Sequence, residues 1–503
     1  MTPKNAEARR GVLGGVLFAA LAGCAAGPDF RAPAAPAVDG YRKDPLPAAT
    51  VETKAPTGDA QRFVSGADVP AQWWTTFANA ELTRRITQAL AHSPSVASAQ
   101  AALRQAQENA NAARGALLPS VDASAGATRG NANGQGAAAA GSGSVYTLYN
   151  AGARVNYTLD LFGAVRRGVE AESAAVDTQR FQLEGTYQTL AANVATASFR
   201  EASLRGQIRA TEEIIDVYNK ELKLVEAQNQ IGAKSLADVL VIRTQVATAA
   251  ATLPPLRAQL AQTQTQLAVY LGEFPSQSEL AALDLDAFGL PREVPVSLPS
   301  TLTRQRPDVR AAEATLHQAT AKVGVATANL FPQITLSGSL GSSALHSGDL
   351  FSGGTKAWSI GANLLQPIFH GGSLRAQKRA AEAGLDKAAA DYQQTVLGAF
   401  QNVADALRAL ELDAESLKAQ ALAEQSAARS LDLVRIQYHN GSASYLQELD
   451  ATRQYQQTRL GLIQARAARL ADTAALYTAL GGGWKEDSAP AAIATTDASP
   501  QSK

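Results

Sequence analysis

Residues 224–245, LVEAQNQIGAKSLADVLVIRTQ, align without a gap to residues 433–454, LVRIQYHNGSASYLQELDATRQ. An earlier block repeats in the same order, in which Pro94, Val96, Leu103, Gln105 and Pro119 correspond to Pro307, Val309, Leu316, Gln318 and Pro332. Two blocks in one order and at nearly one spacing indicate a duplicated unit of roughly 210 residues. The sequence therefore predicts a chain that is built twice.

Each copy begins with an Ala/Gln-rich stretch that predicts a helix, over 79–117 in the first copy and 301–330 in the second. Each stretch ends at a proline, which disfavours helix in the residue before it. The period then changes to two: polar and apolar residues alternate in 154–161, 333–340 and 358–364. This alternation predicts strands with one wet face and one apolar face.

The predicted strands form one hairpin in each copy, over 119–161 and 332–368. Small residues fill the connections at 131–144 and 342–354, which favours exposed hairpin ends. A strand of about 8–12 residues can cross an outer membrane at a tilt. Four strands cannot close a barrel, since about eight is the practical minimum. Chains must therefore associate, giving 8, 12 or 16 strands.

A long helical pattern follows the second strand of each copy, from about 165 to 230 and from about 374 to 439. Each predicted helix is roughly 100 Å long at ~1.5 Å per residue. Gly232 and Gly441 lie where each helix ends and an antiparallel partner begins. In the second copy a heptad seam is predicted from Phe400, Val403, Leu407, Leu410, Ala414, Leu417, Ala421, Ala428 and Leu431, with Glu424 as its polar exception.

The heptads alone would also fit a closed helical bundle, which leaves the strand pairs unexplained. In the first copy Pro254 and Pro255 interrupt the descending helical pattern. A proline pair there must break or kink the helix.

The N-terminus has the layout of an export signal, because Lys4, Arg9 and Arg10 precede the short apolar run at 11–22. Leu21-Ala22-Gly23-Cys24 resembles the lipobox of bacterial lipoproteins, which implies cleavage after residue 23 and acyl chains on Cys24. The residues after Cys24 are both alanine, whereas an aspartate is the usual signal for retention in the inner membrane. The alternative is an ordinary signal peptide with an incidental cysteine.

Composition excludes several classes of protein. The chain has 45 basic and 45 acidic residues and no net charge, so nothing indicates a nucleic-acid partner. No uncharged apolar stretch after residue 24 approaches 18 residues, so no membrane-spanning helix is expected. The five histidines are scattered and no catalytic motif has a suitable context. We expect no enzyme, no metal site and no cofactor other than the lipid on Cys24.

The order of these features, with RPDVRAAE at 306–313 and YLQELDATR at 445–453, resembles the TolC-like outer membrane factors, and specifically the lipoprotein branch that serves tripartite, RND-type efflux systems. The resemblance covers roughly residues 60–482. It implies a homotrimer with a 12-stranded barrel in the outer membrane and a long periplasmic α-helical barrel. A periplasmic adaptor and an inner-membrane pump would be its partners.

Five segments are predicted on this basis: a signal peptide at 1–23, a lipidated N-terminal segment at 24–78, repeat one at 79–290, repeat two at 291–482, and a disordered tail at 483–503. The function implied is a passive exit duct that exports drugs or other toxic small molecules. The alternatives are a duct for protein secretion and, from a different class, a periplasmic coiled-coil adaptor.

The resemblance also implies a gate at the periplasmic end. Leu446, Asp450 and Arg453 share one face of the helix after the second hairpin tip, and the family's closing ring maps onto them, with Tyr438 as a further partner. Repeat one has Ala237, Val241 and Thr244 at the matching positions, so each chain supplies one acid to the ring. The alternative is an ordinary solvated Asp–Arg pair, worth a few tenths of a kcal/mol.

Overall fold

The computed structural model describes residues 25–131 and 145–482. The predicted signal peptide, Cys24, most of the first hairpin loop and the predicted disordered tail lie outside these residues. The chain forms two compact units. The sheet unit comprises Met1–Pro33, Ala102–Gln179 and Ala311–Gln393, and the hairpin unit comprises Ala34–Ala101, Arg180–Arg310 and Gln394–Lys503. Each unit takes segments from both sequence repeats.

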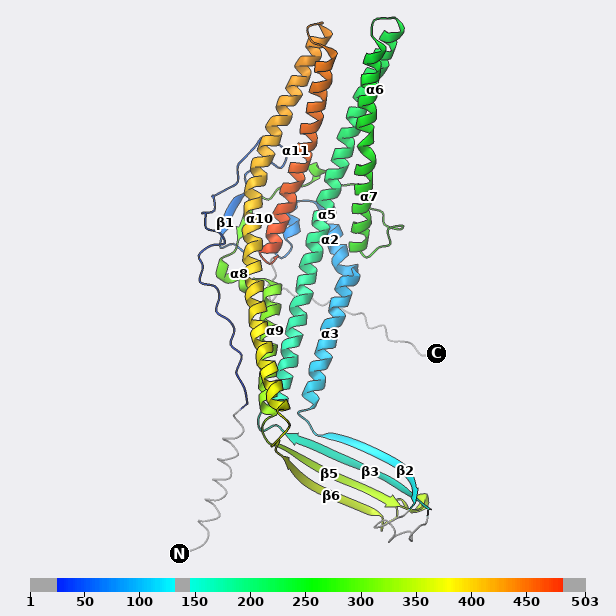
Figure 1. Cartoon of the computed structure of the whole chain (residues 1–503), viewed down its shortest axis with the longest axis vertical. Coiled ribbons are helices and arrows are strands. Elements are labelled where there is room, and N and C mark those ends of the chain that lie inside the picture. Colours follow the sequence, from blue (N-terminus) through cyan, green and yellow to red (C-terminus); the bar gives the residue numbers. More distant parts are fainter. Residues whose placement is uncertain (1–24, 132–144, 483–503) are drawn as a thin grey trace. The chain divides into compact units, whose positions relative to one another are not determined.

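The sheet unit contains one four-stranded antiparallel sheet in the order β2-β3-β5-β6 (Figure 1). Its strands are β2 (Ser120–Asn131), β3 (Val145–Leu159), β5 (Gln333–Ala344) and β6 (Lys356–Leu365). The two predicted strand hairpins are therefore confirmed, and they pair with each other through β3 and β5. Strand β5 runs three residues into the predicted loop at 342–354, whose remainder holds the short turn η4 (Ser347–Asp349).

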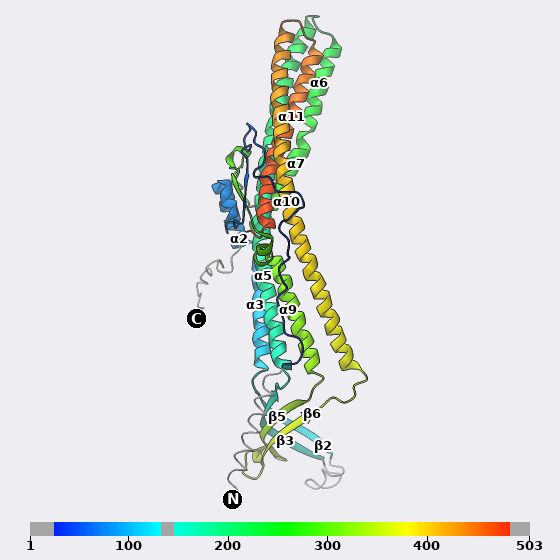
Figure 2. The same ribbon diagram turned by 90° about the vertical axis from the view of Figure 1, so that its left-hand side faces the viewer.

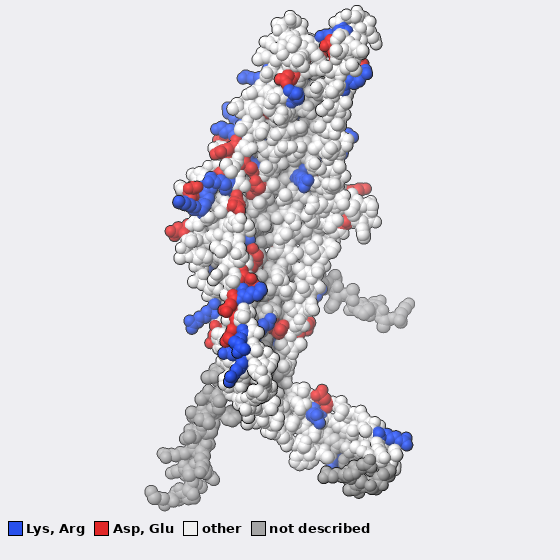
Figure 3. Space-filling model, viewed as in Figure 1, with Lys and Arg blue, Asp and Glu red and all other residues white. Residues whose placement is uncertain are grey.

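The register of the sheet separates polar from apolar side chains. Ala153, Leu340 and Trp358 are aligned across three strands, and the next row holds Arg154, Ser339 and Ser359. On the polar face the hydroxyls of Ser339 and Ser359 are 2.8 Å apart. The apolar face is uncovered, with Trp358 74% exposed, and Figure 3 shows few charged side chains over these strands. The sheet thus presents an apolar surface that the residues described here leave exposed.

The first described residues dock on the helices of the sheet unit, which include α9 (Pro307–Ala328) and the first turns of α5. Arg167 pairs with Asp29 and with Glu170. The ring of Phe30 stacks on His317 with 4.3 Å between centroids. A side chain at Gly27 would meet the Cα of Gly324 at 2.5 Å, so glycine is required for this close approach. The segment after Cys24 is therefore held by specific contacts.

The hairpin unit is built on long helices, shown in Figures 1 and 2 as the pair α10 and α11 and the group α5, α6 and α7. Helix α5 spans Ala164–Gln230, α6 Leu236–Ala251, α7 Leu253–Tyr270, α10 Ser373–His439 and α11 Tyr445–Ala479. The long helices start within one residue of the predicted positions. The seam is buried at Val403, Leu407, Leu410, Ala414, Leu417 and Leu431. Pro254 and Pro255 lie in the first turn of α7, where the helical stretch is divided as predicted.

Neither leading helix of the two repeats is continuous, contrary to the sequence expectation. The first is divided into α2 (Ala80–His92) and α3 (Pro94–Gly115), and the second into α8 (Pro299–Gln305) and α9. Ser93 and Arg306 have extended backbones with ψ of 128° and 122°. Each precedes a proline, whose ring disfavours helical geometry in the residue before it. Because the apolar pattern continues on both sides of Ser93 and Arg306, the sequence pattern predicted a single helix at each place.

A small mixed region completes the hairpin unit. Strand β1 (Arg62–Ser65) pairs in parallel with β4 (Glu293–Val296), and the short helices η1 (Trp73–Phe77) and η3 (Leu285–Ala287) lie in the same unit. Its core is aromatic and is formed by Trp73, Phe77, Phe199, Phe288 and Tyr477. This core anchors the long helices α5 and α11.

The hydropathy of one predicted helical stretch was not expected. Among the described residues, Leu236–Tyr270 is long and apolar enough to cross a membrane by length and composition, and its most apolar 18-residue window has a mean hydropathy of 1.3. Asp238 and Arg243 interrupt this stretch, so it contains no uncharged apolar run of 18 residues. Only 17% of its most apolar window is buried. Its apolar side chains are therefore largely exposed in the single chain.

Candidate functional site

The two helical hairpins end in the same turn. Gly232 lies between α5 and α6 with φ of 76°, and Gly441 lies between α10 and α11 with φ of 75°. These left-handed conformations are readily adopted by glycine. The N–H of Ala233 donates to the carbonyl of Gln228, and that of Ser442 to Gln437, both at 2.8 Å. This is the hydrogen bond of a Schellman cap.

A capping box starts the helix after each turn. Ser235 caps α6 by exchanging hydrogen bonds with Asp238, and Ser444 caps α11 by exchanging them with Gln447. The side-chain oxygen of each serine accepts from a backbone N–H that the helix leaves unpaired. Local chemistry therefore fixes both tips in the same way.

The predicted gate residues lie on the first turns of α11 and are open to solvent. Leu446 is 71% exposed. Asp450 and Arg453 form an ion pair whose side chains are 66% and 69% exposed. Together with Val241 of α6 they line a groove of about 650 Å³ between the two hairpins. These side chains are free to contact a neighbouring molecule.

Tyr438 lies in a different environment. Its ring is 5.6 Å from that of Tyr445, and the Lys234 ammonium of the first tip lies 5.7 Å from the Tyr438 ring and 5.8 Å from the Tyr445 ring. Cation–π contacts of this kind contribute about 0.5–1 kcal/mol at exposed sites. Tyr438 thus joins the second hairpin to the first, whereas Asp450 pairs with Arg453 on its own helix.

Two carboxylates beneath the tips were not singled out from the sequence. Glu221 of α5 and Glu448 of α11 each have one buried oxygen that no hydrogen-bond donor reaches. Burial and the nearby Glu448 raise the pKa of the Glu221 carboxyl, against the opposing effect of His439, Arg435 and Lys234. The two hairpins therefore meet around acidic groups with unmet hydrogen-bonding capacity.

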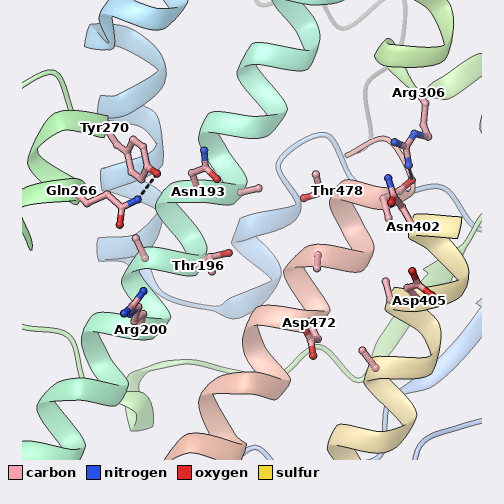
Figure 4. A pocket seen from close by; sticks show the side chains of 16 residues that line it. Asn193, Thr196, Arg200, Gln266, Tyr270, Arg306, Asn402, Asp405, Asp472 and Thr478 are labelled. Atoms are coloured by element: carbon pink, nitrogen blue, oxygen red, sulfur yellow. Dashed lines mark hydrogen bonds between the residues drawn. The ribbon is translucent and has the colours of Figure 1, made fainter. Parts of the chain in front are cut away.

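A second cavity, of about 650 Å³, lies further along the same helices (Figure 4). It is lined by residues of α5, α7, α10 and α11, among which Arg200, Asp405, Asp472 and Thr478 are labelled in the figure. Gln266 donates to the Tyr270 hydroxyl at 2.7 Å across one wall. Its lining mixes cationic, anionic and neutral polar groups, so it favours no single class of ligand.

A buried charge cluster adjoins this cavity. The carboxyls of Asp413 and Asp472 contact each other, and burial, followed by Asp472, raises the pKa of Asp413 to about 7, while Arg469 opposes the rise. Arg469 is fully buried and donates to the carbonyls of Thr57 and Asp59 and to the hydroxyl of Thr50. It fastens the N-terminal segment to α11.

Nothing in the described ranges, 25–131 and 145–482, gathers three or more His, Cys, Asp or Glu side chains in a way that could hold a metal ion. Cys24, the predicted lipidation site, lies outside those ranges. The geometry is therefore that of paired hairpins with a charged tip and an uncovered apolar sheet.

Comparison with known proteins agrees with this architecture. A family model described as "Outer membrane efflux protein" matches residues 85–273 and 298–482. The antibiotic efflux pump outer membrane protein ArpC of Pseudomonas putida is 32% identical over 475 residues, which are 94% of this chain and 95% of that protein. The probable outer membrane lipoprotein SilC of Salmonella typhimurium is 28% identical and covers 82% of this chain and 88% of its own length.

Among solved structures, the outer-membrane channel OprN has a TM-score of 0.81 and 28% sequence identity. The match covers 92% of this chain and all of that one. The mixed fold with four strands per chain and an internal duplication is therefore confirmed.

Proposed function

Because the chain belongs to the family of outer membrane efflux proteins, we propose that three copies of it form the exit duct of a tripartite efflux pump. The chain is an outer membrane component of an efflux system, through which small molecules pass to the exterior. In this role the chain is a passive conduit, and the inner-membrane pump would supply the energy for transport. It is therefore not an enzyme.

The observation that carries the proposal is the four-stranded sheet. Its edge strands β2 and β6 have one partner each within the described chain, and open edges in lipid leave backbone groups unpaired at several kcal/mol each. Three copies supply 12 strands, an even number above the minimum of about eight for a membrane barrel. The exposed apolar face, which includes Trp358 and Ile360, would then face lipid.

The hairpin unit supports association of the same copies. The α6–α7 stretch exposes Leu236, Leu240, Val241 and Val269 by between 42% and 63%. An apolar surface of this kind on a periplasmic helix requires a cover. A second copy packed against it would extend the paired hairpins into a periplasmic α-helical barrel.

The partners proposed are a periplasmic adaptor and an inner-membrane pump. The hairpin tips carry exposed polar and apolar groups on capped, well-defined turns, which suits docking of a partner. Membership of the family argues against the adaptor alternative. The name of ArpC refers to antibiotics, which favours small-molecule cargo over secreted protein.

Cys24 is proposed to carry the lipid. Support comes from the lipobox, from the lipoprotein name of SilC, and from the contacts of Asp29 and Phe30, which hold the segment just after Cys24 on the sheet unit. One acyl chain alone gives marginal membrane binding. The lipid would add to the attachment that the barrel provides.

The proposed gate is a ring of Leu446, Asp450 and Arg453 from three chains. At rest the leucines would narrow the passage and the aspartates would bind cations. Tyr438 would act by holding the second hairpin against the first through Lys234. Docking of the adaptor would separate the hairpins and open the ring.

Closure of the barrel is tested by cross-linking between edge strands. Ala125 of β2 is changed to Cys, together with one residue at a time in β6 that lies on the same face of the sheet: Ile360, Ala362 or Leu364. At least one combination should give covalent oligomers that end at three chains after oxidation. The control is Ala125→Cys with Ala151→Cys, which face each other within one chain and should give no oligomers. Covalent oligomers of more than three chains would refute the trimer. The absence of any covalent oligomer, while the control pair oxidises, would refute it as well.

A further inference from the structure

A single hydrophobic cluster joins the two hairpins of each chain beneath their tips. It is formed by Ile214, Tyr218 and Val225 of α5, by Val239, Ile242 and Ala249 of α6, and by Tyr445 and Leu449 of α11. The proposed opening of the gate would have to separate these helices. Groups within this contact therefore influence the balance between closed and open tips.

Two carboxylates from different hairpins lie at this contact. One oxygen of Glu221 and one of Glu448 are buried and receive no hydrogen bond. The other oxygen of Glu448 lies 3.5 Å from Arg435. The hydroxyl of Tyr445, a residue only 9% exposed, is also buried without a partner. Three polar groups at this contact therefore each have a buried oxygen without a hydrogen-bond partner.

The groups that face this site come from every element around it. They are Tyr218 and Glu221 of α5, Lys234 of the first tip, Arg435, Tyr438 and His439 of α10, and Tyr445 and Glu448 of α11, with Arg453 near Tyr218. The cations lower the pKa of Glu221, while burial and the neighbouring Glu448 raise it. Burial has the largest effect on the pKa of Glu221 and raises it.

We propose that Glu221, beside Glu448, forms a titratable link between the two hairpins, which holds the tip closed when Glu221 carries a proton and weakens when Glu221 is ionised. A buried carboxylate oxygen without a donor is costly. A proton on Glu221 removes one charge from the contact and with it the repulsion from Glu448. The link rests on the proposed gate, since it concerns the separation of the same hairpins.

The direction of the effect follows from linkage. In the closed state the pKa of Glu221 is raised, whereas after separation the carboxyl is in water and has its ordinary pKa. The closed state therefore binds the proton more tightly, and acid favours closure. As the pH rises through the raised pKa, this contribution to closure is lost. Each unit of pKa difference changes the open-to-closed ratio up to tenfold per chain.

The test measures tip separation and conductance in parallel. Nitroxide spin labels on Ala233→Cys and Ser442→Cys, both at exposed tip positions, report the distance between hairpins in the full-length trimer. In the otherwise unchanged protein, the fraction with separated tips should rise several-fold between pH 5 and pH 8. In Glu221→Gln the tips should stay together across this range, because glutamine resembles the protonated acid.

The matched control is Glu226→Gln on the same helix, since Glu226 pairs with Arg243 inside the first hairpin at 2.7 Å. It should keep the pH response. Glu448→Gln serves as a second variant should Glu221→Gln fail to assemble, and it should also flatten the response. A pH response that is equal in Glu221→Gln and the parent protein overturns the link.

Single-channel conductance separates this inference from the gate itself. If the spin labels follow pH as expected while conductance does not, the link stands and the ring at Leu446 does not control the passage. If tip separation is independent of pH in the parent protein, the link is wrong, whatever the conductance of gate variants.

Discussion

Replacing Asp413 with Asn should stabilise the protein at alkaline pH and leave its stability unchanged in acid. Asp413 of α10 contacts Asp472 of α11, and one oxygen of Asp413 is buried without a donor. Two carboxylates in contact cannot both be ionised at low cost, so one proton must be retained. Asparagine keeps the shape of the protonated acid and supplies a donor.

The magnitude follows from the shift in pKa. The pKa of Asp413 is about 7 in the folded protein, against an ordinary value of 3.8. The stabilising contribution of its proton is fully present below pH 3.8 and is lost as the pH rises through about 7. The difference of about three units is worth at most ~4 kcal/mol at ~1.4 kcal/mol per unit. Partial exposure of the pair reduces this to about 1–2 kcal/mol.

The assay is thermal unfolding of the detergent-solubilised protein at pH 5 and pH 8, followed by helical circular dichroism. The melting temperature of Asp413→Asn should exceed that of the parent protein at pH 8, and the two should approach each other at pH 5. Asp405→Asn is the control, because Asp405 is an exposed residue of the same helix. An equal difference at both pH values would refute the shared proton.

Three further outcomes are expected. Asp450→Ala with Arg453→Ala should raise single-channel conductance in planar bilayers with unchanged trimer content, since an exposed pair contributes only ~0.2–1 kcal/mol to stability; parental conductance in an assembled trimer would exclude this gate. Cys24→Ser should abolish palmitate labelling and leave assembled trimer, so label retained in the variant would contradict lipidation there. Cysteines placed in 131–144 or 342–354 should react with an impermeant thiol reagent on intact cells, whereas reaction only after lysis would invert the topology.

Local periodicity was sufficient to predict most of the fold. The change from a period near 3.6 to a period of two marked both strand hairpins, and the long helices were placed within one residue. Such features depend on residues close together in sequence. The breaks at Pro94 and Pro307 were missed although the same proline rule applied, because an apolar pattern that continues on both sides looks like one helix.

The polar contacts between distant helices could not be predicted in this way. Glu221 and Glu448 belong to different repeats, and Asp413 and Asp472 to different helices. Which faces meet depends on how the hairpins pack, and a single sequence contains no local signal for that packing. Glu448 did carry a weak clue, since the repeat alignment sets it against Val239, a buried residue of the first hairpin.

The difference between Glu448 and Val239 shows that the two repeats have different roles at the tip. Both tips keep the residues that build the turn, a left-handed glycine and a serine cap. At the position of Glu448 the first repeat buries an apolar side chain in the shared core, and at Asp450 it has Val241. At these two positions the second hairpin therefore has acids where the first has valines. Because Glu221 of the first hairpin lies near Glu448 of the second, a change of pH would act on the contact between the hairpins rather than on either hairpin alone.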